Sequence, residues 1–278
     1  MRANWFGLAG ERVRRRFGRF GSGEIISGIP GSSTQHYGVP YSLTEEFTAV
    51  YRMHPLLPDH YVLRSAATTE TVGECEFGEL AGPRARDVLG EYSLADLFYS
   101  FGTGYAGAMV LGNYPRSLQR FVRPDNKLMD MAAVDIMRIR EAGVPRYNEF
   151  RRQLRLRPAR DFADLSDEPD VVRTMRELYA DDVEKVDLVV GMLAEKRPAG
   201  FGFSDTAFRI FILMASRRLN SDRFFTGSYD PRVYSEVGVR WIDAATMSSV
   251  LLRHCPGLAA RLDARSNAFQ PWPDTPPP

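Results

Sequence analysis

The chain has 278 residues, of which 44% are hydrophobic and 26% charged, and its 36 basic and 35 acidic residues give a net charge of +1. This composition excludes a wholly disordered protein and a disulfide-stapled miniprotein, and the length is enough for one large or two ordinary domains. The balanced charge argues against a nucleic-acid partner. No apolar run approaches the roughly 18 residues of a membrane span. The two cysteines, Cys75 and Cys255, provide neither a metal cluster nor a disulfide framework.

The first 40 residues predict a lead-in segment rather than part of a folded domain. Met1–Gly21 is basic but lacks the apolar core and the cleavage site of a signal peptide. It is interpreted as a solvated basic segment, and the alternative is an amphipathic helix at a membrane surface. Gly21–Pro40 is rich in Gly, Ser and Pro and predicts an irregular connection. These features predict a cytoplasmic protein, with peripheral membrane contact as the alternative that the basic segment leaves open.

A helix is predicted to begin at Ser42, because Glu45 follows this serine by three residues as in a capping box. Apolar and aromatic side chains then recur at i, i+3, i+4 and i+7, so they share one face of the helix: Phe47, Val50, Tyr51 and His54. Pro55 and Pro58 are predicted to end this helix.

The remaining elements predict a mainly α fold with short strands at most. Residues 64–92 are interpreted as loop with short strands, and Ser93 as the cap of a helix that runs to Gly112 through several small residues. Residues 269–278 are interpreted as a Pro-rich disordered tail. Further helices are predicted over Leu128–Ala142, Tyr147–Leu156, Asp170–Tyr179, Val183–Glu195, Asp205–Leu219 and Ala244–His254. Ser204 is the predicted cap of the helix over Asp205–Leu219.

His54 differs from the other histidines because it ends a predicted helix and follows a tyrosine by three residues. Periodicity alone favours a core histidine whose polar atoms are satisfied locally. The alternative is an axial metal ligand. A zinc site of the ordinary kind needs several ligands, whereas haem needs only one from the protein, so haem is the metal group that this pattern allows.

A long motif surrounds this histidine, namely Tyr51-Arg52-Met53-His54-Pro55-Leu56-Leu57-Pro58-Asp59, preceded by Tyr41-Ser42-Leu43-Thr44-Glu45-Glu46-Phe47. It resembles the proximal-haem helix of the fatty-acid α-dioxygenases, a branch of the animal-type haem peroxidase superfamily related to the cyclooxygenases. Further stretches resemble that branch in the same order, over nearly the whole chain: Asn113-Tyr114-Pro115, Arg138-x-Arg140, the run from Pro145 to Arg152, Asp187-Leu188-x-Val190-Gly191, the run from Ala215 to Phe225, and Asn267-Ala268-Phe269-x-x-Trp272.

The resemblance implies the C-terminal, proximal-haem half of the animal haem peroxidase helical fold over residues 41–268. It implies one haem b, with His54 as the proximal ligand of its iron. Tyr51 is implied to form a tyrosyl radical that removes a hydrogen atom from C2 of a fatty acid, after which O2 adds to give a 2-hydroperoxide. Side chains at i and i+3 of a helix are neighbours, so phenol and imidazole are expected to face one pocket. The alternative for Tyr51 is an aromatic core residue.

Two further positions follow from the resemblance. Arg218 matches the arginine that binds the substrate carboxylate, and its planar fork suits that task. Arg217 and Arg223 are adjacent alternatives, and a solvated helix end is the competing interpretation. Asp135 matches a residue that hydrogen-bonds the proximal imidazole. Its alternative is an ion pair with Arg138 or Arg140.

The first residue of the chain corresponds to a position about halfway along the sequences of family members. The distal histidine and the family's calcium site precede that position, so they are expected to be absent from this chain. A second polypeptide is expected to supply the distal half unless the reading frame is truncated. The leading interpretation is therefore a haem peroxidase or fatty-acid dioxygenase that acts on fatty acid with O2 or peroxide. The alternatives are a non-catalytic remnant that binds haem, and an Arg-rich helical module that binds lipid or protein without a cofactor.

Overall fold

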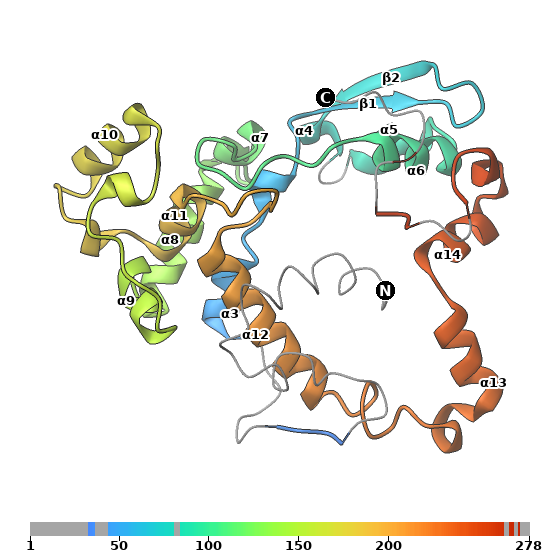
Figure 1. The fold of residues 1–278 in the computed structure, drawn as a ribbon. Helices are drawn as coiled ribbons and strands as arrows, with labels where there is room; N and C mark the ends of the chain where they lie inside the picture. The colour runs from blue at the N-terminus through green and yellow to red at the C-terminus, as the bar shows by residue number, and fades with distance from the viewer. Residues whose placement is uncertain (1–32, 37–43, 81–83, 264–266, 270–271, 273–278) are drawn as a thin grey trace. The chain divides into compact units, whose positions relative to one another are not determined.

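The computed structural model describes residues 33–36, 44–80, 84–263, 267–269 and 272, and these form a mainly helical protein with short hairpins (Figure 1). The fold class predicted from the sequence is therefore confirmed. The chain forms two compact units. The first unit comprises residues 1–37, 58–106 and 219–278, and the second comprises 38–57 and 107–218. The single domain proposed for residues 41–268 stays a prediction.

Residues 58–106 of the first unit contain a hairpin covered by a helix. Strands β1 (His60–Arg64) and β2 (Thr71–Glu76) pair antiparallel, and α6 (Leu94–Thr103) packs against β1. Their shared core consists of Leu63, Cys75 and Leu97. Short strands were predicted within residues 64–92, but the same stretch also contains two short helices that the sequence did not indicate, α4 (Phe77–Leu80) and α5 (Ala85–Gly90).

Helix α6 begins as predicted and ends early. The Ser93 hydroxyl accepts a hydrogen bond from the Asp96 amide at 3.1 Å, which confirms the predicted cap. The prediction that the helix reaches Gly112 is wrong, because Gly104 has extended backbone dihedral angles (φ −74°, ψ 148°) and ends it. Gly104 and Gly107 have little intrinsic tendency to continue a helix.

The C-terminal part of the first unit contains α13 (Pro231–Ala244), α14 (Met247–His254) and the 3-10 helix η4 (Pro256–Ala260). Helix α13 was not predicted, and the predicted start of the next helix at Ala244 is wrong, since a capping box at Thr246 begins α14. The prediction of a disordered tail is wrong at Trp272, which is 4% exposed. Its indole packs with Tyr99, Leu251 and Leu258 because a large apolar ring gains from leaving water.

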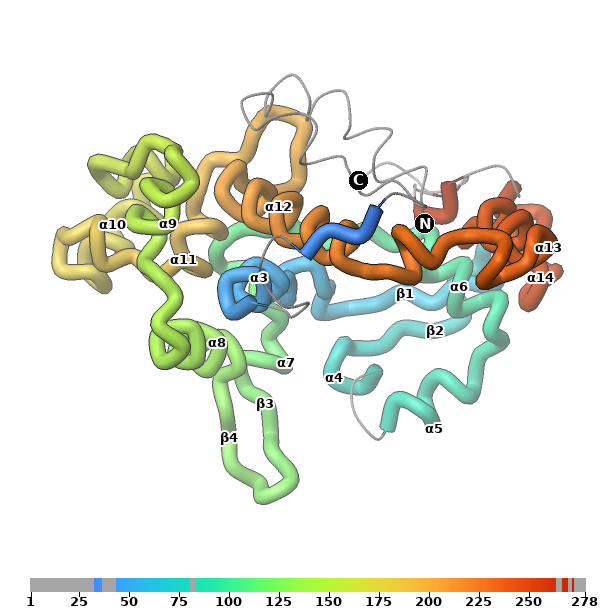
Figure 2. Tube along the Cα trace, turned by 90° about the horizontal axis from the view of Figure 1, so that it is seen from below, coloured from blue at the N-terminus to red at the C-terminus, as the bar shows by residue number. Residues whose placement is uncertain are grey.

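The second unit contains the residues of the candidate site. Its elements in chain order are α3 (Glu45–Val50), η1 (His54–Leu56), α7 (Arg116–Gln119), β3 (Phe121–Val122), β4 (Leu128–Met129), α8 (Met131–Glu141), α9 (Tyr147–Gln153), η2 (Phe162–Asp164), α10 (Pro169–Leu178), η3 (Val183–Lys185), α11 (Leu188–Ala194) and α12 (Asp205–Ser221), whose last three residues belong to the first unit. Figure 2 shows the β3–β4 hairpin extending away from α7 and α8. The core of this unit joins α3, α8, α9 and α11 around Val50, Ile139, Tyr147 and Leu188.

Several helix boundaries in this unit differ from the predicted ones. Helix α8 begins at Met131 instead of Leu128, because the Asp130 carboxylate caps it through the amides of Ala132 and Ala133. The predicted helix over Val183–Glu195 is divided into η3 and α11. Helix α12 does begin after Ser204, whose hydroxyl accepts from the Ala207 amide at 3.3 Å, and this confirms the predicted cap.

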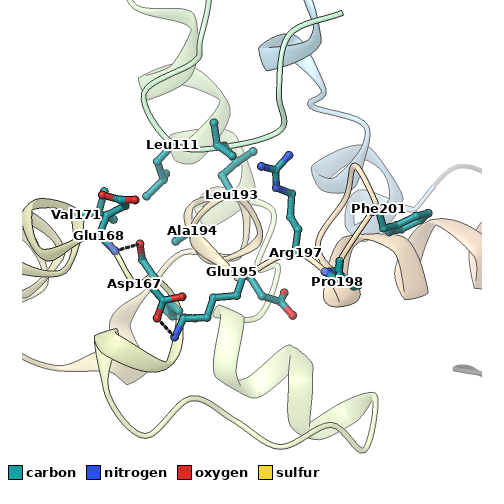
Figure 3. A pocket seen from close by; sticks show the side chains of 16 residues that line it. Leu111, Asp167, Glu168, Val171, Leu193, Ala194, Glu195, Arg197, Pro198 and Phe201 are labelled. Carbon is teal, nitrogen blue, oxygen red and sulfur yellow. Dashed lines mark hydrogen bonds and ion pairs between the residues drawn. The ribbon is translucent and has the colours of Figure 1, made fainter. Parts of the chain in front are cut away.

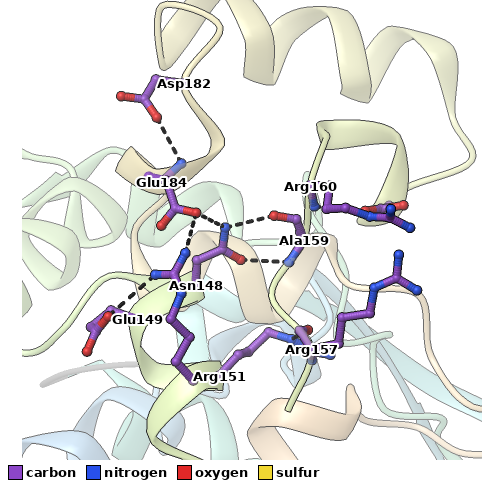
Figure 4. A network of polar contacts seen from close by, with 10 residues as sticks. Asn148, Glu149, Arg151, Arg157, Ala159, Arg160, Asp182 and Glu184 are labelled. Carbon is purple, nitrogen blue, oxygen red and sulfur yellow. Dashed lines mark hydrogen bonds and ion pairs between the residues drawn. The ribbon is translucent and has the colours of Figure 1, made fainter. Parts of the chain in front are cut away.

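Polar residues of the family-like motifs join the helices of this unit. The side-chain amide of Asn148 bonds the backbone of Ala159 in both directions, at 2.9 Å and 2.8 Å, and donates to Glu184 at 2.9 Å (Figure 4). Arg140 and Arg146 both donate to the buried carboxylate of Asp187, which also accepts from Tyr179 at 3.0 Å. These motif residues therefore support the fold rather than form a site.

Within the described residues, no helix combines the length and the apolar character needed to cross a bilayer.

Candidate active site

Tyr51 and His54 lie at the junction of two different helical segments. The predicted helix through His54 is wrong: α3 ends at Val50 with Tyr51 as its C-cap, and His54 begins the 3-10 helix η1. The N-cap of α3 is Thr44, whose hydroxyl accepts from the Phe47 amide at 3.3 Å, while the predicted cap, Ser42, lies outside the described residues. Pro55 lies in the first turn of η1, where its missing amide hydrogen is no loss.

The aromatic ring of Tyr51 packs between two segments of the second unit. Its centroid is 5.0 Å from that of Phe47 and 6.1 Å from that of Phe211 on α12. The side chain nevertheless remains 58% exposed, so the interpretation as an ordinary core residue does not fit. The i, i+3 argument for a common pocket with His54 does not apply, because the two residues belong to different helical segments.

The imidazole of His54 faces the carboxylate of Asp135, a residue of α8 that is 2% exposed. His54 Nδ1 lies 3.5 Å from Asp135 Oδ2, and Arg52 Nε lies 3.2 Å from Asp135 Oδ1. The Tyr114 hydroxyl donates to Asp135 Oδ2 at 3.3 Å, and the rings of Tyr114 and His54 are 5.2 Å apart. Asp135 therefore lies beside the imidazole, as the resemblance implies, but the expected hydrogen bond to Nδ1 is not formed.

The ion-pair alternative for Asp135 is met by a different arginine from those expected. Arg52 is its ionic partner, whereas Arg140 binds Asp187 at 2.6–2.8 Å. Burial lowers the pKa of His54 below its ordinary value, the Asp135 charge opposes this shift, and the Arg52 charge adds to it. The imidazole is thereby favoured in its neutral form, which is the form that can bind a metal ion.

The turn that carries His54 is fixed by residues far along the chain. The Pro55 carbonyl accepts from the Asn113 side-chain amide at 3.0 Å, and the Leu56 carbonyl accepts from the Gly107 amide at 2.9 Å. A Cβ atom on Gly107 would collide with the Pro55 carbonyl oxygen, so glycine permits this close approach of two backbones.

The arginines proposed for the substrate carboxylate lie at and after the end of α12. Arg218 is half-buried and follows Phe211 and Met214 at the i, i+3, i+7 spacing of one helix face. Arg217 is exposed and points about 100° away from Arg218 around the helix axis. Arg223 lies beyond the helix, with its guanidinium over the Phe224 ring at 4.4 Å. Of the three, Arg218 shares its face with the aromatic neighbour of Tyr51.

A cavity of about 800 Å³ in the same unit contains none of the predicted site residues (Figure 3). Its wall combines apolar side chains such as Leu111, Leu193 and Phe201 with a Lys196–Asp167 ion pair at 2.5 Å. In the part of the chain that the structure describes, no group of three or more His, Cys, Asp or Glu side chains is placed to hold a metal ion.

Comparison with known families places this geometry in context. The animal haem peroxidase family matches residues 1–269. The chain belongs to the animal haem peroxidase family. It is 41% identical to an alpha-dioxygenase of Oryza sativa subsp. japonica, over 98% of this chain and 46% of that protein. It is 42% identical to an alpha-dioxygenase of Nicotiana tabacum, over 100% of this chain and 45% of that protein.

Solved structures of this family agree with the fold. The crystal structure of the Oryza sativa fatty acid alpha-dioxygenase superposes with a TM-score of 0.82 at 39% identity, covering 98% of this chain and 47% of that one. Peroxidase A from Dictyostelium discoideum, at 22% identity and a TM-score of 0.69, shares the fold. The chain spans about half the length of these relatives.

The residues present fit the haem that an animal haem peroxidase binds. The His54 imidazole is half-buried, its burial favours the neutral form by lowering its pKa, and its Nδ1 faces a carboxylate. Its Nε2 atom makes no hydrogen bond or ion pair with the described residues. Nδ1 of His54, Oδ1 of Asp135 and Nε of Arg52 are all buried without a hydrogen bond among those residues, a cost that functional sites commonly carry.

Sequence reasoning missed Arg52, Gly107 and Asn113, as well as the role of Tyr114. Arg52, Asn113 and Tyr114 lie inside motifs that resemble the family, so their identity was visible. Their contacts were not, because Tyr114 and Asp135 are 21 positions apart, and Asn113 and Pro55 are 58 apart.

Proposed function

We propose that this chain forms the proximal-haem half of a fatty-acid dioxygenase that produces 2-hydroperoxides. The observation that carries the proposal is the His54–Asp135 arrangement, in which Nδ1 of a half-buried imidazole faces a buried carboxylate at 3.5 Å and Nε2 makes no hydrogen bond or ion pair with the described residues. This arrangement occurs within a chain that is about 40% identical to the Oryza sativa fatty acid alpha-dioxygenase. The whole activity is a proposal because the chain spans about half of that protein.

His54 is proposed as the proximal ligand of one haem b, through Nε2. The haem, when bound, supplies the one-electron oxidant that the reaction needs. Asp135 is proposed to hold the imidazole orientation through Nδ1, as carboxylates do for metal-binding histidines. A calcium site is proposed to lie outside this chain, as the family resemblance implies.

Tyr51 is proposed as the residue that carries the radical. Its phenoxyl oxygen would take a hydrogen atom from C2 of the fatty acid, which leaves a carbon radical at C2 and restores the phenol. Addition of O2 to C2, followed by return of a hydrogen atom from the phenol, gives the 2-hydroperoxide and regenerates the radical. Exposure of more than half of the Tyr51 side chain supports access by a substrate. A tyrosine-to-phenylalanine variant of the Oryza sativa enzyme has been crystallised with palmitic acid.

Arg218 is proposed to bind the fatty-acid carboxylate, with Arg217 and Arg223 as the less favoured candidates. Helical side chains lean toward the N-terminus of their helix, which directs Arg218 back toward Met214 and Phe211. Phe211 is the ring that contacts Tyr51. A carboxylate bound by Arg218 therefore brings C2, the adjacent carbon, toward the Tyr51 side of α12.

The distal half of the haem pocket is proposed to come from polypeptide outside this sequence, either a second chain or another part of the same protein. The proposal includes a cytoplasmic location, with peripheral contact at a membrane surface as the alternative, since such contact suits a substrate that partitions into lipid. A haem-binding remnant without catalysis is the alternative function.

The test combines haem titration with oxygen consumption. Haemin added to the purified chain is expected to give a Soret band at one equivalent. Palmitic acid with O2 is expected to give 2-hydroperoxypalmitate, measured by mass spectrometry, once the segment of the relatives outside the match is supplied as a separate chain. Absence of a Soret band in both mixtures would contradict the haem assignment. A Soret band without oxygen consumption in either would favour the non-catalytic alternative.

A further inference from the structure

The carboxylate of Asp135 is approached from segments that are distant in the sequence. Arg52 follows α3, and Tyr114 precedes α7. Arg52 Nε lies 3.2 Å from Oδ1, and the Tyr114 hydroxyl donates to Oδ2 at 3.3 Å. Oδ2 is also the oxygen that faces His54 Nδ1, at 3.5 Å. Oδ2 of Asp135 therefore faces both the Tyr114 hydroxyl and the His54 imidazole, while Oδ1 faces the Arg52 guanidinium.

The sharing of this carboxylate has a chemical consequence. A carboxylate near an imidazole favours the tautomer that carries its hydrogen on the nearer nitrogen, which leaves the lone pair on the farther one. Each additional donor on the same carboxylate withdraws electron density and weakens its hold on the imidazole hydrogen. The 3.5 Å separation exceeds an ordinary hydrogen bond of about 2.7–3.2 Å, and Nδ1 makes no hydrogen bond with the described residues, as expected where the Tyr114 hydroxyl already donates to Oδ2.

We propose that Arg52 and Tyr114 are positioning residues that hold the Asp135 carboxylate against His54 Nδ1 and limit its pull on the Nδ1 hydrogen. His54 is thereby locked as the Nδ1–H tautomer, with Nε2 left as the ligand atom. The inference rests on the proposed function in that His54 is taken as the haem ligand. Its first readout needs no haem.

A purely structural role for the two residues is the competing explanation, and the chain offers a matched control for it. The Tyr179 hydroxyl donates at 3.0 Å to Asp187, a second buried aspartate that also binds arginines. Removing the Tyr179 hydroxyl therefore removes a similar tyrosine–aspartate bond elsewhere in the same unit. Tyr179→Phe is expected to affect stability as Tyr114→Phe does, but to leave His54 unchanged.

The first experiment measures the His54 ring nitrogens by nitrogen-15 NMR in the haem-free chain. The unaltered chain is expected to show hydrogen on Nδ1. Tyr114→Phe and Arg52→Gln are expected to keep this tautomer and to move the Nδ1 proton resonance downfield, because Asp135 then binds that hydrogen more strongly. Asp135→Asn is expected to abolish the tautomer preference. Tyr179→Phe is expected to leave all His54 signals in place.

The second experiment uses the haem-loaded chain and compares the direction of each shift. Tyr114→Phe and Arg52→Gln are expected to raise the iron–histidine stretching frequency and lower the reduction potential, since the imidazole becomes more electron-rich. Asp135→Asn is expected to move both quantities in the opposite direction. Arg52→Lys, which keeps the charge, is expected to restore most of the original values.

Hydrogen on Nε2 of His54 in the unaltered chain would overturn the proposal. So would iron–histidine frequencies that shift in the same direction in Tyr114→Phe, Arg52→Gln and Asp135→Asn. His54 signals that move as much in Tyr179→Phe as in Tyr114→Phe would also overturn it. The proposed function can fail separately. If the NMR pattern is as expected but haemin gives no Soret band, His54 is not a haem ligand, while Arg52 and Tyr114 still orient Asp135.

Discussion

The ring of Tyr51 lies 6.1 Å from that of Phe211, at an interplanar angle of 26°. This contact joins the end of α3 to α12 and places the phenol beside the helix that carries Arg218. Because aromatic rings supply the contact, the phenolic oxygen itself is not needed for it. The chemistry of that oxygen can therefore be removed without loss of the packing.

Tyr51→Phe is expected to abolish fatty-acid oxygenation and to leave haem binding intact. The variant keeps the ring and loses the O–H bond that a radical mechanism requires. Soret titration and oxygen consumption, measured on the same preparation with the missing half supplied, separate the two effects. Oxygenation at the unaltered rate would place the radical on another residue.

Arg218→Leu is expected to weaken fatty-acid binding by about 2–5 kcal/mol, roughly 30-fold to several thousand-fold in Kd, the usual cost of removing one member of a desolvated charge pair. Arg218→Lys should recover only part of this loss, since an ammonium group cannot bind both carboxylate oxygens in the same plane. Isothermal titration with palmitate provides the measurement. Arg217→Leu is the control, and equal small effects of the two leucine variants would contradict the assignment.

His54→Ala is expected to remove specific haem absorbance. His60→Ala is the matched variant, because His60 is exposed on β1 and pairs with Glu74 and Glu76 at 3.4 Å and 3.2 Å. It should titrate with haemin like the unaltered chain. An unchanged Soret band in His54→Ala would show that another group binds the iron.

Gly107→Ala is expected to destabilise the chain by about 1–3 kcal/mol, because the added methyl group meets the Pro55 carbonyl and displaces the turn that holds His54. Urea unfolding measures the free-energy difference. Gly90→Ala is the control, since a Cβ at this helical position meets nothing within 4 Å, and it should be neutral or slightly stabilising. Equal unfolding midpoints for the two variants would argue against the close backbone approach.

Asp187→Asn is expected to reduce the dependence of stability on acid pH. Burial raises the pKa of the Asp187 carboxyl, but hydrogen bonds from Arg140 and Tyr179 and the charge of Arg146 outweigh it, so the folded pKa lies below the ordinary 3.8. The resulting stabilisation is fully present above pH 3.8 and is lost as the pH falls through the lower folded value.

At pH 7 the Asn variant should therefore be less stable by about 1–3 kcal/mol, a modest figure because both arginines are partly exposed. The difference from the unaltered chain should shrink below about pH 4. Unfolding curves at several pH values give the comparison. Asp170→Asn removes an exposed pair with Arg173 and should lower stability at pH 7 by less than about 1 kcal/mol.

Local signals in the sequence predicted what depends on local chemistry. The caps at Ser93 and Ser204 were predicted because a hydroxyl and an amide three residues later suffice to form them. The same reasoning failed around His54, since Pro55 was taken to end one helix whereas it lies in the first turn of another.

Helix α13 was not predicted because a helix is normally identified by the apolar pattern of its buried face, and α13 lacks such a face among its described residues. Val237 and Trp241 are spaced as on one face but remain exposed, and Ser235 adopts a non-helical backbone within the segment. The contacts of Asp135 with Arg52 and Tyr114 were not predicted for another reason. They join residues up to 83 positions apart (135 − 52), and such pairings follow from the packing of α8 rather than from any nearby signal.

The packing of Trp272 on α6 affects the order in which the first unit can be completed during synthesis. The Trp272 amide bonds the Gly102 carbonyl at 3.4 Å, and the indole covers the side of α6 that carries Tyr99. A ribosome adds the 170 residues between these positions (272 − 102) at about 5–20 per second, which takes roughly 10–30 s. During that interval the apolar side of α6 has emerged and its cover has not. Chaperone binding to the nascent chain is thus expected to be strongest between the emergence of α6 from the ribosome and the emergence of Trp272.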